Sequence, residues 1–301
     1  MDQSMSTALP ADRPGPTIAE CTAVGSGRTH NEDSVRHCVP DEPRILARKG
    51  ILCLVADGMG GHLAGEVASR EAVDLVTRHY YGNPSHNVAA SLERAVQAAN
   101  ATIGARADAD RGRSGMGTTL VAAVVRGTEV FVANVGDSRA YHVGAKGISR
   151  ITEDHSWVEE QVRAGFLTPD QARTHPHRNL VTRALGSRPE VDVDLYEGEL
   201  EAGDCLVLCT DGVSGQLLDS EIEDIVRTRA PGEAARALVS LVSERGGRDD
   251  ASVLVFRPAS DAHGRPQPVT SRSRAAWTWL LVSVAVLLGL LALLLTLVPE
   301  M

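Results

Sequence analysis

One run of glycines around a single aspartate limits what this chain can fold into more than any other feature. The apolar segment 50–55 leads to Asp57, which lies among four glycines, at positions 58, 60, 61 and 65, ahead of an amphipathic helical pattern. Glycine permits close backbone approach and positive φ. A dinucleotide-binding fingerprint would need glycine where Leu63 stands, and a P-loop would need a Gly-Lys-Ser/Thr sequence that does not follow here. A carboxylate at a strand end, beside exposed carbonyl groups, instead favours a hard cation.

Acidic residues recur at the ends of strand-like segments along the whole chain. They occur in the segments Asn31–Asp33, Asn134–Arg139, Cys209–Gly212 and Gly246–Asp250. A single Asp-Gly turn is ordinary hairpin chemistry and predicts no function by itself. Several acidic corners together indicate a cation site, because clustered carboxylates repel one another unless cations neutralise them.

With these segments in place, the chain resembles the metal-dependent protein phosphatases of type 2C, in their bacterial form. The matching segments follow the order and spacing of that family: Arg28–Ser34, Asp57–His62, Gly115–Thr119, Gly136–Arg139, Thr210–Gly212 and Gly247–Asp250. The resemblance covers about residues 17–257. It implies an α+β fold, a four-layer α-β-β-α sandwich of two antiparallel sheets flanked by helices. It also implies hydrolysis of phosphoserine and phosphothreonine in proteins by a water that two metal ions activate.

The resemblance assigns roles to individual residues. Asp57 would bridge two Mn²⁺ or Mg²⁺ ions, and Gly58 would bind one of them through its carbonyl group. The other expected metal ligands, direct or through water, are Glu32, Asp33, Asp211 and Asp249. Arg28 would hold the substrate phosphate, the alternative being a solvated arginine at a strand end. Asp137 would hold a third, weaker ion, the alternative being a turn or a structural hydrogen bond to Arg139.

Three positions depart from the family pattern, and several histidines need an interpretation. Met59 stands where some eukaryotic members have a histidine proposed as general acid, so the acid is unassigned. Asp250 replaces the usual asparagine and adds a negative charge, and a histidine at position 30 replaces a polar amide. We expect His62 to begin a helix and His155 to be structural. The sequence His175–His177 is a weak metal candidate against a solvated loop.

Composition excludes some classes of protein and indicates a compartment. The 301-residue chain is 43% hydrophobic, enough for a substantial core, and its net charge of −9 argues against a nucleic-acid binder. Its five cysteines are odd in number and include no Cys-x-x-Cys pair, so we expect reduced, buried thiols in a cytosolic domain.

A membrane anchor is predicted after the catalytic region. Residues 1–16 are polar and proline-rich, and we expect a disordered tail there. The catalytic domain would span residues 17–257, followed by a linker at 258–275 and a transmembrane helix at 276–298. The segment from Trp277 to Val298 carries no charge and would be about 33 Å long as a helix, which matches a bilayer core. Three preceding arginines, at positions 265, 272 and 274, place the catalytic domain on the cytoplasmic side.

Periodicity predicts the elements that carry the motifs. Segments 117–125, 129–133 and 139–143 indicate an antiparallel meander, and 205–209 and 251–256 indicate two further strands. Helical periodicity covers 63–80, 88–107, 220–229 and 232–244. Residues 149–190 resemble the family's variable flap beside the active site, with short helical pieces at 157–164 and 169–174.

The sequence leaves the physiological role open. The expected partners are phosphoserine and phosphothreonine proteins, among them membrane serine/threonine kinases and their substrates, together with the lipid bilayer. One alternative is a phosphatase dedicated to a small regulatory protein in a partner-switching cascade. Another is an inactive relative that binds phosphoproteins at the membrane, although every expected metal carboxylate is present.

Overall fold

The computed structural model describes residues 15–60, 63–109, 116–259 and 270–271. The predicted transmembrane helix, most of the predicted tail and linker, and His62 lie outside these residues. Within the described part, no helix combines the length and apolar character needed to cross a membrane. The strands are β1 Thr17–Ala23, β2 Asp33–Cys38, β3 Ile51–Met59, β4 Gly117–Thr118, β5 Leu120–Arg126, β6 Glu129–Val135, β7 Arg139–Gly144, β8 Gly147–Arg150, β9 Asp194–Glu199, β10 Cys205–Cys209, β11 Ala251–Arg257 and β12 Thr270–Ser271. The helices are α1 Pro43–Lys49, α2 Leu63–Gly82, α3 Val88–Ala109, α4 Trp157–Arg163, α5 Pro169–Thr174, α6 Asp211–Ser214, α7 Asp219–Thr228 and α8 Pro231–Glu244.

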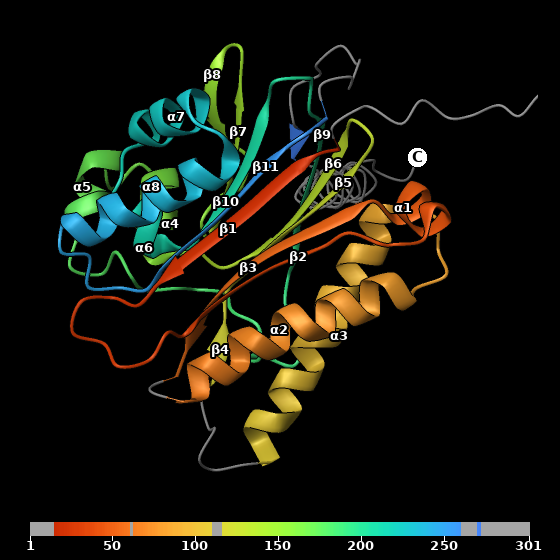
Figure 1. The fold of residues 1–301 in the computed structure, drawn as a ribbon. Coiled ribbons are helices and arrows are strands. Elements are labelled where there is room, and N and C mark those ends of the chain that lie inside the picture. The colour runs from red at the N-terminus through yellow and green to blue at the C-terminus, as the bar shows by residue number, and fades with distance from the viewer. Residues whose placement is uncertain (1–14, 61–62, 110–115, 260–269, 272–301) are drawn as a thin grey trace, which may run out of the picture.

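The strands form two antiparallel sheets that pack face to face. One sheet has the order β1-β11-β10-β7-β8, and the other has the order β12-β9-β6-β5-β3-β2, with β4 paired to β3. Helices α2 and α3 cover the outer face of the second sheet, while α7 and α8 cover the outer face of the first (Figure 1). The predicted α+β fold of two antiparallel sheets flanked by helices is therefore confirmed.

Alternation along the strands builds three apolar layers. On β3, Leu52 and Leu54 pack toward α2 and α3, whereas Cys53 and Val55 pack into the layer between the sheets. Strand β10 alternates in the same way between the helices of its own side and the layer between the sheets. Successive side chains of a strand point to opposite faces, so a sheet covered on both faces needs apolar residues at nearly every position.

The predicted meander is wrong in its third strand. Strands β5 and β6 pair as expected, but β7 pairs with β10 and β8 in the other sheet. The crossing takes place at the turn Gly136–Ser138, where Gly136 has a φ of 109°. A Cβ at Gly136 would lie 2.6 Å from the side chain of Thr119, so this turn requires glycine. Period-two patterning predicts a strand but does not identify its partner, which is why the sequence could not assign β7 to its sheet.

Some elements that the prediction omitted carry recognisable signals. Helix α1 begins with proline at its first turn, ends in Arg48 and Lys49, and is closed by Gly50 at a φ of 72°. The sequence from Val191 to Leu195, which leads into β9, alternates strictly between apolar and acidic residues. Both signals were available in the sequence. The predicted helices at 63–80 and 88–107 correspond to α2 and α3, each two residues longer than expected.

Candidate metal and phosphate site

Two predicted metal ligands face each other across neighbouring strands. Asp33, at the start of β2, is the register partner of Asp57, near the end of β3. Directly opposed residues of an antiparallel pair point to the same face of the sheet. Asp57 shares the face of Cys53 and Val55, so both carboxylates point toward the space between the two sheets.

The other sheet supplies the remaining acids to the same edge. Asp211 begins α6 immediately after β10, and the hydroxyl of Thr210 donates to Asp33 Oδ2 over 3.0 Å, which ties the two sheets together. Asp137 lies in the turn that crosses between the sheets, and Asp249 precedes β11. One cleft of about 980 Å³ is lined by Arg28, Asp137, Asp211 and Asp249. Residues separated by most of the chain therefore meet at one place.

The glycines around Asp57 serve a close backbone contact within the protein. A Cβ at Gly58 would lie 2.1 Å from the carbonyl oxygen of Gly65, in the first turn of α2, and 2.6 Å from that of Glu32. The amide of Gly58 also donates to the Glu32 carbonyl over 3.1 Å. Helix α2 thus packs directly on the end of β3, which fixes Asp57 beside the other acids of the cluster.

Burial and mutual repulsion raise the pKa of the clustered carboxylates. For Asp33, burial and then the charges of Asp250 and Asp211 raise the pKa to about 8, against hydrogen bonds from Ser252 and Thr210. Burial raises the pKa of Asp211 to about 6, with repulsion from Asp249 as the next cause. The pKa values of Asp57 and Asp137 also lie well above the usual range, again through burial first and neighbouring acids second. A bound cation would neutralise the charges that repel one another and would lower the pKa values of these carboxyl groups.

The donor set fits divalent cations of the magnesium or manganese kind. Oδ1 of Asp33 and Oδ1 of Asp211 are buried and have no hydrogen-bond partner in the described part of the chain. Buried polar atoms are normally paired, so two unpaired carboxylate oxygens in one acidic cluster leave coordination places for an ion. Within the described ranges, no three acidic, histidine or cysteine side chains converge closely enough to enclose an ion by themselves. Mg²⁺ usually keeps several waters and takes only one or two protein carboxylates, so the geometry and the donor set are compatible.

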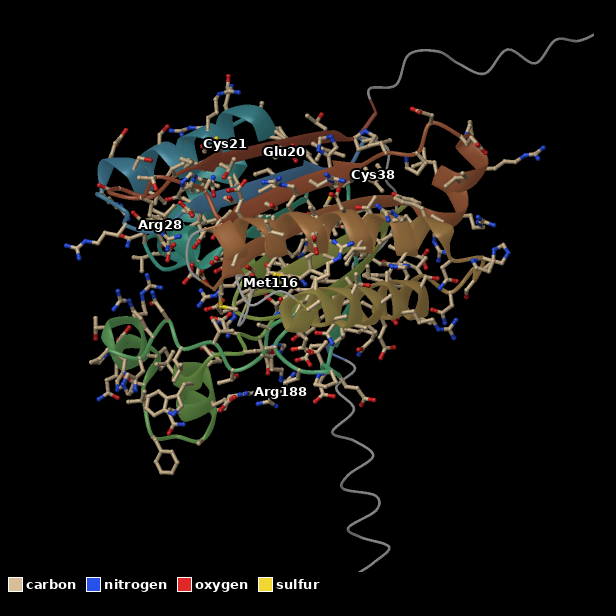
Figure 2. All side chains as sticks on the ribbon, turned by 90° about the horizontal axis from the view of Figure 1, so that it is seen from below. Glu20, Cys21, Arg28, Cys38, Met116 and Arg188 are labelled. Carbon is tan, nitrogen blue, oxygen red and sulfur yellow. The ribbon has the colours of Figure 1, made fainter. Side chains whose placement is uncertain are left out.

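Arg28, the predicted phosphate ligand, lies at the mouth of this acidic cluster. Its guanidinium contacts Asp249 at 2.5 Å, Asp250 at 2.9 Å and Glu32 at 3.4 Å. About 35% of its side chain remains exposed. Figure 2 places Arg28 at the end of the two sheets nearest to the green helices α4 and α5. Arg28 is therefore held beside the metal-ligand candidates and lines the cleft, and its role as the phosphate ligand stays a prediction.

Asp250 holds this corner together, a role that the sequence did not reveal. Only 1% of its side chain is exposed. Its Oδ1 accepts from the amide of Gly25 over 2.8 Å, and its Oδ2 accepts from the amide of Glu32 over 2.8 Å and from Arg28 Nη1 over 2.9 Å. Three N–H groups thus donate hydrogen bonds to the Asp250 carboxylate and stabilise its negative charge. The sequence indicated only that a charge had been added.

His155 supports the turn that carries Asp137. The amide of Gly136 donates to His155 Nδ1 over 3.0 Å, and the amide of His155 donates back to the Gly136 carbonyl over 2.9 Å. Because Nδ1 accepts, the ring hydrogen of the neutral tautomer is on Nε2, which donates to Asp194 Oδ2 over 3.1 Å. These contacts agree with the structural role expected for His155. Arg139 binds Asp154 through two nitrogens and does not bond to Asp137, so the metal role of Asp137 stays a prediction.

The predicted flap lies beside the cleft. Helices α4 and α5 contribute Val158, Ala172 and Arg173 to the cleft lining. The weak metal candidate within the flap is an aromatic cluster: the rings of His175 and His177 lie 5.0 and 5.3 Å from the ring of Trp157. The histidines therefore pack around an indole, and nothing in their contacts favours a metal.

Comparisons with known proteins agree with this geometry. The family model described as Protein phosphatase 2C matches residues 26–244. The chain is 36% identical to the serine/threonine phosphatase stp of Listeria welshimeri over 241 residues, which cover 78% of this chain and 92% of that protein. It is also 36% identical to the serine/threonine protein phosphatase PstP of Mycobacterium tuberculosis, covering 81% of this chain but 45% of that longer protein.

Solved structures show the same similarity. The M. tuberculosis phosphatase PstP/Ppp superposes with a TM-score of 0.72 at 34% identity, covering 81% of this chain and 99% of that one. The catalytic domain of PstP in complex with two manganese ions superposes with a TM-score of 0.70 at 33% identity, covering 81% of this chain and 98% of that one.

Proposed function

Because this chain belongs to the protein phosphatase 2C family and is a serine/threonine protein phosphatase, we propose that its acidic cleft hydrolyses phosphoserine and phosphothreonine with two bound Mn²⁺ or Mg²⁺ ions. One observation carries the proposal: buried carboxylates from both sheets meet at one edge, and Asp33 and Asp211 each keep an orphaned oxygen there. The two manganese ions in the related catalytic domain support the choice of metal.

The residues at this site would have separate roles in binding the ions and the phosphate. Asp33, Asp57, Asp211 and Asp249, the carbonyl of Gly58 and, close by, Glu32 would hold the ions, with Asp137 as the ligand of a third. When bound, the divalent ions supply an activated water and neutralise charge that develops on the phosphoryl oxygens. Arg28 would direct its guanidinium fork to the phosphate oxygens and orient phosphorus toward the acidic end of the cleft. Asp250 keeps Arg28 in that position.

Replacing Asp57 tests the proposal. Asp57→Asn removes a charge but keeps the side-chain shape, so Mn²⁺-dependent release of phosphate from a phosphothreonine peptide should fall on the order of 100-fold or more. The matched control is Asp41→Asn, at an exposed aspartate before α1, which should leave the rate unchanged. Full activity of the wild-type protein in excess chelator would overturn the metal mechanism.

We further propose that the protein is anchored in the membrane by residues 276–298, with the catalytic domain in the cytoplasm. The uncharged segment from Trp277 to Val298 and the arginines at 265, 272 and 274 support this. Full-length protein should stay with membranes after carbonate extraction, and deletion of residues 276–301 should release it without changing kcat. Recovery of the intact protein in the cytosolic fraction would refute the anchor. Anchoring would bring the cleft close to membrane kinases and their phosphorylated substrates.

A further inference from the structure

The cleft lined by Asp137, Asp211 and Asp249 is also lined by several arginines. Arg173 on α5, Arg178 after α5 and Arg248 before β11 all line the same cleft of about 980 Å³ as Arg28 and Asp249. All three are exposed. They come from the flap and from the loop that leads to β11, so they face the cleft from separate segments.

Most other arginines of the cleft are already neutralised. Arg139 and Arg150 bind Asp154 and Glu159, and Arg245 binds Glu221. Within the described ranges, by contrast, no carboxylate lies within ion-pair distance of Arg173, Arg178 or Arg248; Arg173 donates over 3.4 Å to the carbonyl of Leu217. Arg178 and Arg248 are therefore available to an anion in a protein whose net charge is −9, whereas the charge of Arg173 already acts on Glu221.

We propose that Arg178 and Arg248, with Arg173 beside them, form a subsite for a second anionic group of the substrate. The proposal rests on the proposed phosphatase function and specifies its substrate class: phosphoproteins with carboxylates or a further phosphate near the phosphorylated residue. The scissile phosphate would lie beside the acidic cluster with its ions and Arg28, and the flanking anion would lie beside Arg178 and Arg248. Guanidinium groups suit both carboxylate and phosphate, so the two sources share one recognition chemistry.

The charge distribution explains why this subsite would select its substrate. An acidic flank would be repelled by the carboxylates of the cluster unless cations faced it elsewhere in the cleft. Exposed ion pairs are individually weak, so two or three of them together would give a preference of about tenfold. The preference should weaken as salt rises, since the Debye length is about 10 Å at 0.1 M ionic strength.

Three peptides separate the sources of the anion. Each carries one central phosphothreonine, flanked by neutral residues, by aspartates, or by a second phosphothreonine. Dissociation constants are measured by fluorescence anisotropy in chelator, and kcat/KM is measured with Mn²⁺. We expect wild-type protein to bind both anionic peptides about tenfold more tightly than the neutral one. A preference for the doubly phosphorylated peptide alone would assign the subsite to phosphate.

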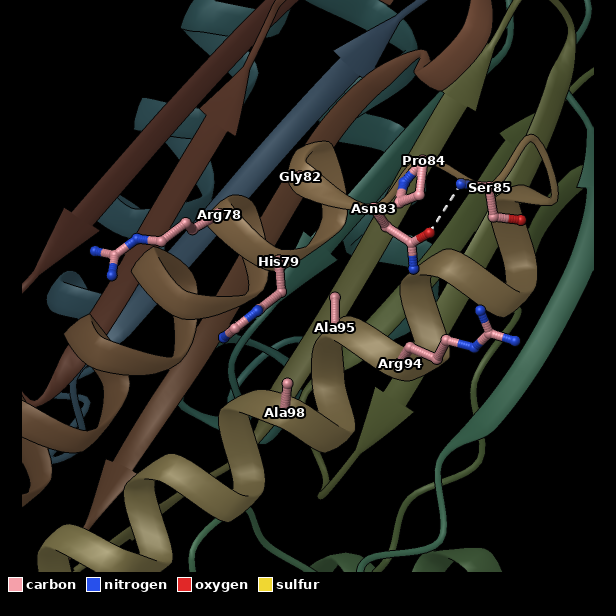
Figure 3. A pocket seen from close by; sticks show the side chains of 9 residues that line it. All are labelled: Arg78, His79, Gly82, Asn83, Pro84, Ser85, Arg94, Ala95 and Ala98. Atoms are coloured by element: carbon pink, nitrogen blue, oxygen red, sulfur yellow. Dashed lines mark hydrogen bonds between the residues drawn. The ribbon is translucent and has the colours of Figure 1, made fainter.

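Charge reversal then locates the subsite. Arg178→Glu with Arg248→Glu should abolish the preference for the anionic peptides in binding and in kcat/KM. The matched control reverses Arg78 and Arg94, exposed arginines on α2 and α3 in a different groove of about 710 Å³ (Figure 3), and should keep the preference.

The outcomes distinguish the subsite from the activity it serves. Equal binding of the three peptides by wild-type protein, or equal losses in both double variants, would overturn the subsite. Failure to hydrolyse the neutral peptide with Mn²⁺ would count against the phosphatase mechanism, while the binding measurements in chelator would still decide the subsite.

Discussion

Two groups of carboxylates at the same corner of the molecule differ in how their oxygens are used. Asp250, which is 1% exposed, accepts from two backbone amides and from Arg28. Asp33 is 8% exposed, yet one oxygen of Asp33 and one of Asp211 are buried without a partner in the described part of the chain. Burial alone does not separate structural acids from metal ligands. The hydrogen-bond inventory does, because a buried oxygen without a donor is costly unless a ligand completes it.

The largest expected effect would come from Asp211→Asn, which changes one of the two aspartates with an unpaired oxygen. Loss of the charge should lower Mn²⁺-dependent hydrolysis of a neutral phosphopeptide on the order of 100-fold or more. The free energy of unfolding in chelator should not fall, because the change removes repulsion among neighbouring acids. Phosphate release and urea unfolding measure the two quantities. A loss of stability with normal specific activity would show that Asp211 is a structural acid and not a metal ligand.

Asp250→Ala should give the opposite pattern. The amides of Gly25 and Glu32 would lose their acceptor, so the free energy of unfolding should fall by about 3 kcal/mol in urea titrations. Asp250→Asn keeps an acceptor oxygen and serves as the milder control, with a smaller loss. A change below about 0.5 kcal/mol for the alanine variant would break the comparison, since surface substitutions alone reach that value.

Arg28→Ala tests the link between the two groups. Loss of its charge-assisted hydrogen bonds to phosphate should lower kcat/KM by about 1.5–3 kcal/mol in steady-state kinetics, with metal binding retained. If Asp250 acts on catalysis by positioning Arg28, adding Asp250→Asn to Arg28→Ala should cause no further loss of kcat/KM in the folded protein. Additive losses would show that Asp250 affects catalysis by another route.

Asp194 offers the smallest effect, on a satisfied carboxylate outside the cluster. Burial raises its pKa, but hydrogen bonds from His155 and Arg183 and the charge of Arg183 outweigh burial and hold the pKa below its ordinary value. A depressed folded-state pKa stabilises the protein above the unfolded value of about 3.9 and loses this effect as pH falls. The unfolding free-energy difference between wild type and Asp194→Asn should therefore be about 1 kcal/mol near neutral pH and shrink below about pH 4. A difference independent of pH would contradict the assignment.

Much of the fold could be predicted because local patterns follow backbone periodicity. The apolar stripes of α2 and α3 and the short apolar runs of β5 and β6 are properties of short segments. The five aspartates proposed as ligands were likewise found from short motifs, and the structure brings the strand ends that carry them to one edge of the sandwich. Their coordination of metal remains a prediction.

The sequence by itself determined which residues form strands, which turns carry acids and where glycine is required. Only the tertiary structure decided that β7 belongs to the first sheet, beside β10 and β8, and that Asp250 supports Arg28. The reason is physical: periodicity depends on neighbours within a few residues, whereas the donors to Asp250 come from positions 218 to 225 residues away. Such partners are chosen by packing of the whole sandwich, which no local pattern encodes.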